Sequence, residues 1–340
     1  LTNGGIIMKK SISLLLCIAL VMTTLVACGS NSKGVKTGFA VVTSARSSKD
    51  ASEEADGLAQ VDSTAVAVLV DNKGVIKNIV IDVVQTKFNF SATGEFTTDL
   101  ATTFDSKMEL GDDYGMRAAS PIGKEWNEQA EALEKYVTGK TLEEVKGIAV
   151  NGGYPADEDL TASVTMNIAG VLTAIEKAVN NATDLGANAD DKLGLGIVAG
   201  SGNKTVNASE EADGNFQAYT HFGAVSFDKN GKITSSVIDA SQTDVSFSTE
   251  GIITSDLNAE FKSKLELGDG YGMKAASPIG KEWFEQSEAF SKYIKGKTVS
   301  DVTGISLQGG YPADEDLTAT VTMKIGDFIK VVEEASKYAK

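Results

Sequence analysis

Two nearly identical ten-residue stretches carry the residues most able to do chemistry. DEDLTASVTM occupies positions 157–166, and DEDLTATVTM occupies positions 314–323. In each stretch three hydroxyl side chains follow an acidic cluster and precede an expected helix. A hydroxyl so placed can cap the helix or carry a phosphate ester, because a helix N-terminus favours phosphate. The alternation of Thr with Leu, Ala, Val and Met also fits a strand with its threonines facing water.

The two stretches belong to a tandem duplication, the first pattern to look for in a chain. The repeated blocks are ASEEADG (51–57 and 208–214), ELGDDYGMRAASPIGKEWNEQ (109–129, with few changes at 266–286) and GGYPADEDLTA (152–162 and 309–319). Each block returns after 157 residues. We expect two copies of one domain, residues 35–182 and 191–340, joined by a polar linker at 183–190. Each copy is long enough to bury its own core, so we expect each to fold separately.

Within a copy, the residue pattern indicates an α+β fold with an antiparallel sheet and helices. Residues 63–70 and 75–84 are apolar runs separated by the turn sequence Asp-Asn-Lys-Gly, which predicts a β-hairpin. Phe88 and Phe90 alternate with polar residues, as in a half-buried strand.

Three helices are expected in each copy. In the first copy Ser120 and Pro121 are placed as the cap and first residue of a helix whose apolar stripe includes Trp126. Thr141 begins a short helix with a capping box, and an amphipathic helix from about Ile168 closes the copy.

The first residues of the chain predict export and a lipid anchor. Met8 is followed by two lysines, a short apolar run and Leu-Val-Ala before Cys28. A basic region, a short apolar region and small residues before a cleavage point describe a signal peptide, and the run is short for a spanning helix. We assign residues 1–27 to upstream sequence and signal peptide. Leu-Val-Ala-Cys resembles the bacterial lipobox, which implies a lipid on Cys28 at the start of a linker of residues 28–34. We therefore expect the protein on the extracytoplasmic face of the cell membrane.

Several classes of site are disfavoured by composition. The second cysteine, Cys17, lies in the leader, so the mature domain has no thiol for a disulfide, a metal site or a nucleophile. One histidine, His221, cannot serve a catalytic triad in both copies, and we expect a packed or solvated strand residue there. The formal net charge of −16 argues against nucleic acid as a partner. No metal site is expected from the acidic clusters, which lack the spacing of a calcium loop.

The segment DLTASVTMNIAGVLTAIEKAV resembles the flavinylation segment of the bacterial FMN-binding domain. In that family a transferase cleaves FAD and joins FMN through a phosphoester to the last residue of Ser-Gly-Ala-Thr, ahead of an amphipathic helix. The resemblance implies Ser163 and Thr320 as acceptors, with Asp159, Thr161, Asp316 and Thr318 as motif neighbours. Thr161 and Thr318 stand where the family has Gly, and Thr165 and Thr322 are the alternative acceptors.

The whole chain is similar to the two-domain flavinylated lipoproteins of Gram-positive extracellular electron transfer. The resemblance implies an electron carrier with up to two covalent FMN groups and no substrate turnover of its own. It also implies partners: a flavin transferase, a membrane dehydrogenase with quinone as donor, and extracellular acceptors such as ferric iron. The protein would supply attachment, orientation and electrostatics to the flavin.

A second function from a different class stays open. The chain also fits a solute- or peptide-binding lipoprotein whose two copies hold a ligand, and its signal peptide could be a pheromone precursor. Flavin colour that survives denaturation separates the two hypotheses.

Overall fold

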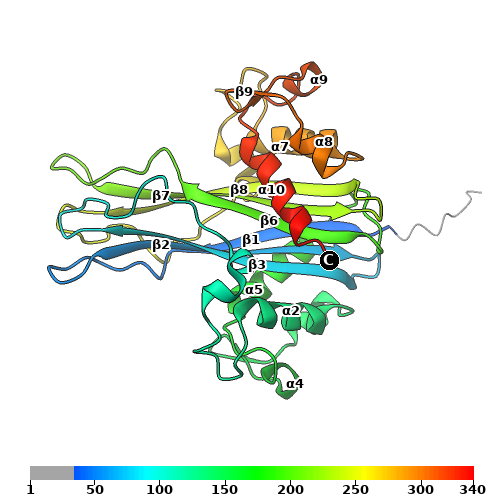
Figure 1. Cartoon of the computed structure of the whole chain (residues 1–340), viewed down its shortest axis with the longest axis horizontal. Coiled ribbons are helices and arrows are strands. Elements are labelled where there is room, and N and C mark those ends of the chain that lie inside the picture. Colours follow the sequence, from blue (N-terminus) through cyan, green and yellow to red (C-terminus); the bar gives the residue numbers. More distant parts are fainter. Residues whose placement is uncertain (1–33) are drawn as a thin grey trace, which may run out of the picture. The chain divides into compact units, whose positions relative to one another are not determined.

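A computed structural model describes residues 34–340, which belong to one compact unit, and it contains two copies of the same α+β arrangement. In each copy a three-stranded antiparallel sheet carries helices on its outer face, and the inner faces of the two sheets pack against each other (Figure 1). The expected leader at 1–27 and the lipidation site at Cys28 lie outside the described residues.

The first sheet is a meander of three strands in the order β1-β2-β3. Its strands are β1 (Lys36–Ser44), β2 (Gly57–Val70) and β3 (Ile76–Phe90). The β2–β3 hairpin forms where the sequence predicts it. The carboxylate of Asp71 accepts hydrogen bonds from the backbone N–H groups of Lys73 and Val75, and Gly74 adopts the positive φ of 79° that the turn requires.

The second sheet repeats the first. Its strands are β6 (Lys192–Ser201), β7 (Gly214–Phe227) and β8 (Ile233–Phe247), in the order β6-β7-β8. Even the register shift near the end of the middle strand recurs, at Leu69/Val70 in β2 and at Ser226/Phe227 in β7. The duplication in the sequence is therefore a duplication of structure.

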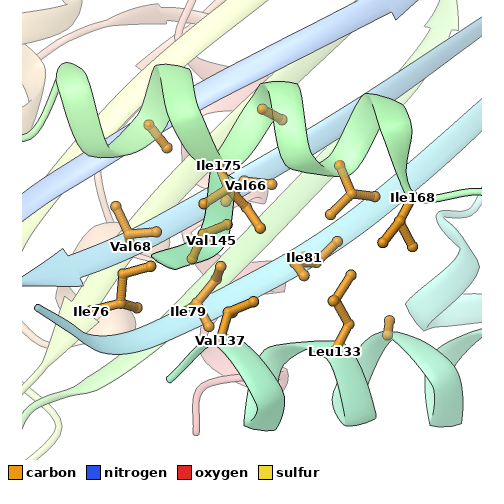
Figure 2. Close-up of a cluster of buried hydrophobic side chains, with 14 of the residues drawn as sticks. Val66, Val68, Ile76, Ile79, Ile81, Leu133, Val137, Val145, Ile168 and Ile175 are labelled. Carbon is orange, nitrogen blue, oxygen red and sulfur yellow. The ribbon is translucent and has the colours of Figure 1, made fainter. Parts of the chain in front are cut away.

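Two long helices cover the outer face of each sheet. They are α2 (Trp126–Val137) and α5 (Ala169–Asn180) in the first copy, and α7 (Trp283–Ile294) and α10 (Gly326–Lys337) in the second. Helix α2 packs on β3 and α5 packs on β1 and β2, while α7 and α10 do the same in the second sheet. Figure 2 shows the resulting core, in which Leu133 of α2 and Ile175 of α5 meet Ile79 and Ile81 of β3.

Short elements connect the long ones and are the same in both copies. In the first copy they are α1 (Lys107–Leu110), η1 (Gly111–Tyr114), α3 (Leu142–Lys146), β4 (Val150–Asn151), β5 (Tyr154–Pro155) and α4 (Glu158–Thr161). In the second they are α6 (Lys264–Leu267), η2 (Gly268–Tyr271), α8 (Val299–Thr303), β9 (Leu307–Gln308), β10 (Tyr311–Pro312) and α9 (Glu315–Thr318). The capping box expected at Thr141 is confirmed.

The helix start expected at Ser120 and Pro121 is wrong. Helix α2 begins at Trp126, with Glu125 as its cap, and residues 116–123 form turns. The Ser120 hydroxyl accepts hydrogen bonds from the backbone N–H of Lys124 and from Nε2 of Gln129, so it stabilises a loop rather than a helix end. Pro favours turns as well as first helical positions, and the local sequence did not separate the two.

The strand interpretation of the repeated ten-residue stretches is also wrong. Both stretches form one helical turn, α4 and α9, followed by a tight bend. Leu160 and Val164 are buried, as are Leu317 and Val321. These pairs are four residues apart, which is the spacing of one helical face, and the even spacing of the apolar residues imitated a strand.

A shared core lies between the two sheets. Phe88 stacks on Phe216 with 4.4 Å between ring centroids, and Phe90 stacks on Phe247 at 4.0 Å. The connecting segment 183–190 joins this core, because Ala187 is buried and its carbonyl accepts a hydrogen bond from the N–H of Val35. The two copies are therefore packed together as well as linked.

Candidate functional site

The two expected acceptor hydroxyls lie just after α4 and α9. Ser163 is half-buried and Thr320 is exposed. Each hydroxyl donates a hydrogen bond to the backbone carbonyl three residues earlier, Ser163 to Leu160 and Thr320 to Leu317, both at 3.2 Å. Each oxygen keeps its capacity to accept a further hydrogen bond, and Thr320 is the more exposed of the two residues.

The carboxylates named beside these hydroxyls do not reach them. Asp159 and Asp316 are exposed, and among residues 34–340 neither acceptor hydroxyl is hydrogen-bonded to a carboxylate. Asp157 and Asp314 act as the helix caps, since each accepts a hydrogen bond from the N–H two residues later. The motif neighbours Thr161 and Thr318 bond their own helical turns, through the carbonyls of Glu158 and Glu315.

The alternative acceptors are held by a buried glutamine. Oε1 of Gln129 accepts the N–H of Thr165 at 2.7 Å and lies 3.3 Å from the Thr165 hydroxyl. Gln286 makes the same contacts with Thr322, at 2.8 Å and 3.3 Å. Thr165 and Thr322 are half-buried in these contacts, so Thr320 is the most accessible of the four hydroxyls considered.

The same glutamine joins the two blocks that the duplication preserves best. Gln129 is fully buried, and its Nε2 donates to the Ser120 hydroxyl at 3.1 Å and to the Lys124 carbonyl at 3.3 Å. Its Oε1 receives the N–H groups of Thr165 and Met166 from the acceptor loop. The block that contains PIGKEW and the block that contains DEDLTA are therefore joined into one structural unit in each copy.

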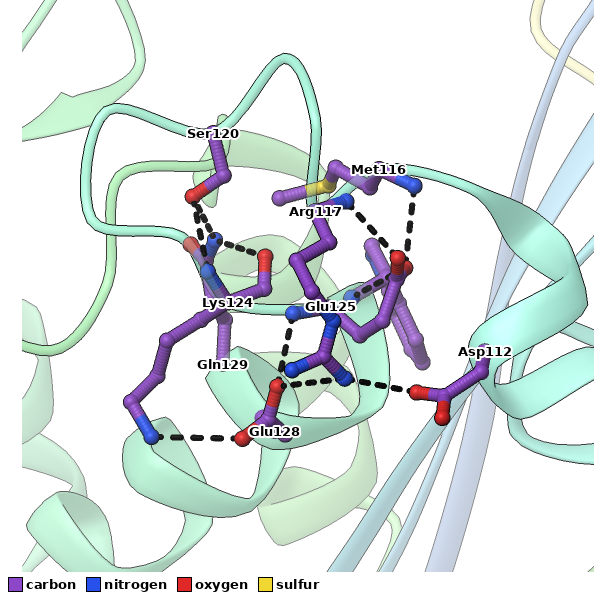
Figure 3. Close-up of polar contacts among 9 residues, drawn as sticks. Asp112, Met116, Arg117, Ser120, Lys124, Glu125, Glu128 and Gln129 are labelled. Carbon is purple, nitrogen blue, oxygen red and sulfur yellow. Dashed lines mark hydrogen bonds and ion pairs between the residues drawn. The ribbon is translucent and has the colours of Figure 1, made fainter.

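A buried glutamate anchors the first of these blocks (Figure 3). The Glu125 carboxylate accepts hydrogen bonds from the N–H groups of Met116 at 2.9 Å and Arg117 at 2.7 Å. Nearer the surface, the Arg117 side chain forms ion pairs with Asp112 and Glu128. Glu282 repeats the two backbone contacts in the second copy, at Met273 and Lys274. In each copy a buried glutamate side chain therefore fixes a loop beside the acceptor segment through two backbone hydrogen bonds.

In each copy a lysine that the sequence patterns did not single out lies against aromatic rings. Nζ of Lys107 lies 4.5 Å from the ring centroid of Tyr114 and 5.4 Å from that of Trp126. In the second copy Lys264 contacts Tyr271 and Trp283 at 4.5 and 5.2 Å. Burial lowers the pKa of Lys107 to about 8 and that of Lys264 to about 7.

The surroundings of the two lysines differ at one strand position. Asp62 in β2 raises the pKa of Lys107 against the effect of burial. Tyr219 takes its place in β7, and Lys264 donates a hydrogen bond to the Tyr219 hydroxyl at 2.8 Å. A cavity of about 390 Å³ borders Lys107, Tyr114 and Gln85. The Ser-Lys pair at 106–107 recurs at 263–264, and this repetition was the signal that the sequence offered. The aromatic rings come close to the ammonium group only when the chain folds.

In each copy a buried aspartate of the sheet contacts the short helix that begins with this lysine. Asp82 accepts hydrogen bonds from the N–H groups of Val83 at 2.7 Å and Met108 at 3.1 Å. Asp239 accepts the equivalent bonds from Ala240 and Leu265 in the second copy. Burial raises the pKa of Asp82 to about 7 and that of Asp239 to about 6, although the hydrogen bonds oppose the shift. The two aspartates hold helices α1 and α6 on the sheets.

His221 is a buried strand residue, as expected. Its ring lies 4.5 Å from that of Tyr219 and contacts Phe328, and Nδ1 is 3.7 Å from a carboxylate oxygen of Asp327. Burial lowers the pKa of His221 to about 4. In the first copy its position is held by Thr64. Across residues 34–340, no cluster of three or more His, Cys, Asp or Glu is placed to hold a metal ion.

Comparison with known proteins gives one short match. A chlorophenol reductase of Desulfitobacterium hafniense is 52% identical over 42 residues, which cover 12% of this chain and 13% of that protein. No protein-family profile matches the chain, and no solved structure matches it. None of the helices between residues 34 and 340 has the length and apolar character needed to cross a bilayer.

Proposed function

We propose that this protein is a cell-surface electron carrier with FMN joined by a phosphoester to Thr320 and, in the first copy, to Ser163. The observation that carries the proposal is that Thr320 is exposed and lies beside a hairpin that carries an exposed aromatic ring with a lysine near its face. The segment recurs in the first copy with Ser163 and Tyr154 but without the lysine, and we propose the second attachment site there. The bound flavin would supply reversible electron transfer.

The residues around Thr320 fit a flavin held at the surface. Tyr311 is 46% exposed, and Nζ of Lys324 lies 5.8 Å from its ring centroid. The N–H of Ile325 donates to the Gly310 carbonyl, which fixes the segment after Thr320 to the hairpin that carries Tyr311. An aromatic face can stack on a planar ring system, and a lysine attracts phosphate.

The first copy offers a weaker version of the same loop. Tyr154 is 52% exposed, but Asn167 stands where the second copy has Lys324, and its amide donates to the Gly152 carbonyl. Ser163 is also less exposed than Thr320. We therefore assign Thr320 as the stronger acceptor and expect equal or lower occupancy at Ser163.

The remaining parts of the proposal concern location and partners. Lipidation at Cys28 would hold the protein on the extracytoplasmic face of the cell membrane, where a covalent cofactor cannot diffuse away. A flavin transferase would load the sites, and a membrane dehydrogenase with quinone would deliver electrons. The acceptors would be extracellular, such as ferric iron, and the net charge of −16 favours the approach of cations.

The short match to a protein named chlorophenol reductase is compatible with a redox setting. It covers about an eighth of either chain, so it transfers neither a substrate nor a reaction. The alternative function is that of a solute- or peptide-binding lipoprotein, for which the supporting observation is a cavity of about 580 Å³ beside β8.

Co-expression with a flavin transferase tests the proposal. The protein should become yellow, keep its flavin fluorescence after denaturation and removal of small molecules, and pass electrons to a ferric chelate once reduced. A variant with both Ser163→Ala and Thr320→Ala should lose all three properties while keeping its circular dichroism spectrum. Colourless wild-type protein from cells with an active transferase would favour the binding-lipoprotein alternative.

A further inference from the structure

The second copy contains a cavity that is larger than the matching groove of the first copy. The cavity, of about 580 Å³, lies where α7 crosses β8 and the connecting segment 183–186 passes the sheet edge (Figure 1 shows α7 and β8). The matching groove of the first copy, between α2 and β3, measures about 350 Å³. There the Lys340 side chain enters the groove and forms an ion pair with Glu134. Thr183, 157 residues before Lys340, borders the larger cavity.

The difference arises from small hydroxyl residues in the second copy. Ser236 stands where the first copy has Ile79, and Ser291 stands where it has Glu134. Both serines line the cavity. At these two positions the second copy therefore has less side-chain volume, and at Ser236 less apolar surface, while its strands stay in register with those of the first copy.

One residue of the lining has a buried polar atom without a partner within the described chain. Ser236 is 6% exposed, and its Oγ makes no hydrogen bond. The neighbouring Ser287 differs, because its hydroxyl donates to the Ile238 carbonyl at 2.7 Å. A buried hydroxyl without a partner is unfavourable and is normally satisfied by a water or a ligand. Rotation about the Cα–Cβ bond of Ser236, which lines the cavity, would present this buried hydroxyl to an occupant.

The lining defines the chemistry of an occupant. Val237, Ile238 and Phe284 supply apolar walls. The charged residues of the lining are two lysines and two acids, Lys292, Lys295, Asp184 and Glu288. Lys292 is ion-paired with Glu288 at 2.7 Å, and Lys295 donates to the Leu185 carbonyl. The charges of the lining cancel, so the cavity selects neither anions nor cations.

We infer that this cavity binds an uncharged, compact and largely apolar organic molecule that carries one hydroxyl or carbonyl oxygen. The oxygen would pair with the Ser236 hydroxyl, and the apolar body would lie between β8 and Phe284. The volume is within the range of small-molecule sites. The inference is independent of the flavin proposal, because Thr320 and its loop contribute nothing to the lining.

A titration of the full folded chain with 2-naphthol tests the inference. Calorimetry and ligand-detected NMR measure the binding. We expect saturable binding of one molecule, with 2-naphthoate, its charged analogue, at least tenfold weaker. Ser236→Ile, which installs the residue of the first copy, should weaken 2-naphthol binding at least tenfold and leave the melting temperature unchanged or higher. Ser236→Ala should weaken it at least threefold and serves if the Ile variant does not fold.

The matched control is Ile79→Ser in the first copy, which should lower the melting temperature without adding a second binding event. Absence of 2-naphthol binding would mean that water alone satisfies Ser236 and would overturn the inference. Affinity that stays within twofold of wild type in both Ser236 variants, or equal binding of 2-naphthoate, would overturn it as well.

Discussion

At the scale of residues, Lys264 is a buried lysine enclosed by three aromatic rings. It is 3% exposed, and its ammonium contacts the rings of Tyr219, Tyr271 and Trp283. Aromatic faces attract a cation, but they replace only part of its lost hydration. The balance leaves the pKa of Lys264 at about 7, well below the ordinary value of 10.5.

Replacing Lys264 with Met should change how stability depends on pH. Because the folded-state pKa is lowered, the unfolded chain binds the extra proton between pH 7 and 10.5, so this lysine makes wild type more stable as pH rises through that window. Lys264→Met should flatten the dependence. Urea unfolding at pH 7 and pH 9.5 measures it, with the exposed Lys135→Met as control. An unchanged pH dependence in Lys264→Met would refute the assigned shift.

At the scale of elements, one glutamine on each long helix fixes the acceptor loop. Gln286 is fully buried on α7, receives the N–H of Thr322 and donates to Ser277 and to the Lys281 carbonyl. It is the contact through which the loop after α9 and the turns before α7 keep their positions. The exposure of Thr320 depends on that loop being held.

Gln286→Ala should destabilise the protein by about 1–3 kcal/mol, because it leaves buried backbone and hydroxyl groups without partners. It should also speed proteolysis within residues 311–323. Chemical denaturation and limited proteolysis measure both effects, and Lys292→Ala on the exposed face of the same helix is the control. Equal protease resistance in Gln286→Ala and wild type would show that the loop does not depend on this glutamine.

The elements also show what the sequence could predict. The β2–β3 hairpin and the Thr141 cap were predictable, because each rests on short-range chemistry that a few neighbouring residues specify. Segment 157–166 was not, since spacings of two and four residues both fit its apolar positions. The contacts of Lys107 and Gln129 were out of reach, because they join residues whose proximity arises only when α1 and α2 pack on β3.

At the scale of the whole molecule, the two copies share two of their hydrophobic clusters. One joins residues of β1, β2 and β3 to residues of β6 and β7, and the other contains the stacked phenylalanines. The expectation that each copy folds separately is untested, and this shared core supports the opposite result. A single copy would expose the inner face of its sheet to water.

Residues 34–188 and 189–340, produced separately, should therefore lack a cooperative unfolding transition as monomers. Co-expression of the two fragments should give a complex of one of each, with the circular dichroism spectrum of the full chain. Gel filtration and thermal melts decide the matter. A monomeric fragment that melts cooperatively would restore the picture of two independent domains.

The stacked phenylalanines should couple the two copies energetically. Phe247→Ala should cost about 3–5 kcal/mol, the usual cost for removing a buried phenylalanine. In a double-mutant cycle with Phe90→Ala, the coupling should be about 0.5–1.5 kcal/mol, since their rings are nearly parallel at 4.0 Å. Urea unfolding of the four proteins gives the value. A coupling indistinguishable from zero would mean that this stack does not join the copies.

Peptide mass spectrometry of the protein made with an active flavin transferase tests the central claim most directly. The account predicts FMN on Thr320, equal or lower occupancy on Ser163, loss of one FMN in Thr320→Ala with the fold intact, and retention of both in Thr322→Ala. FMN on Thr318 or Thr322 would move the acceptor. The account would be contradicted if the peptides covering 157–166 and 314–323 carried no FMN while the transferase modified another substrate in the same cells.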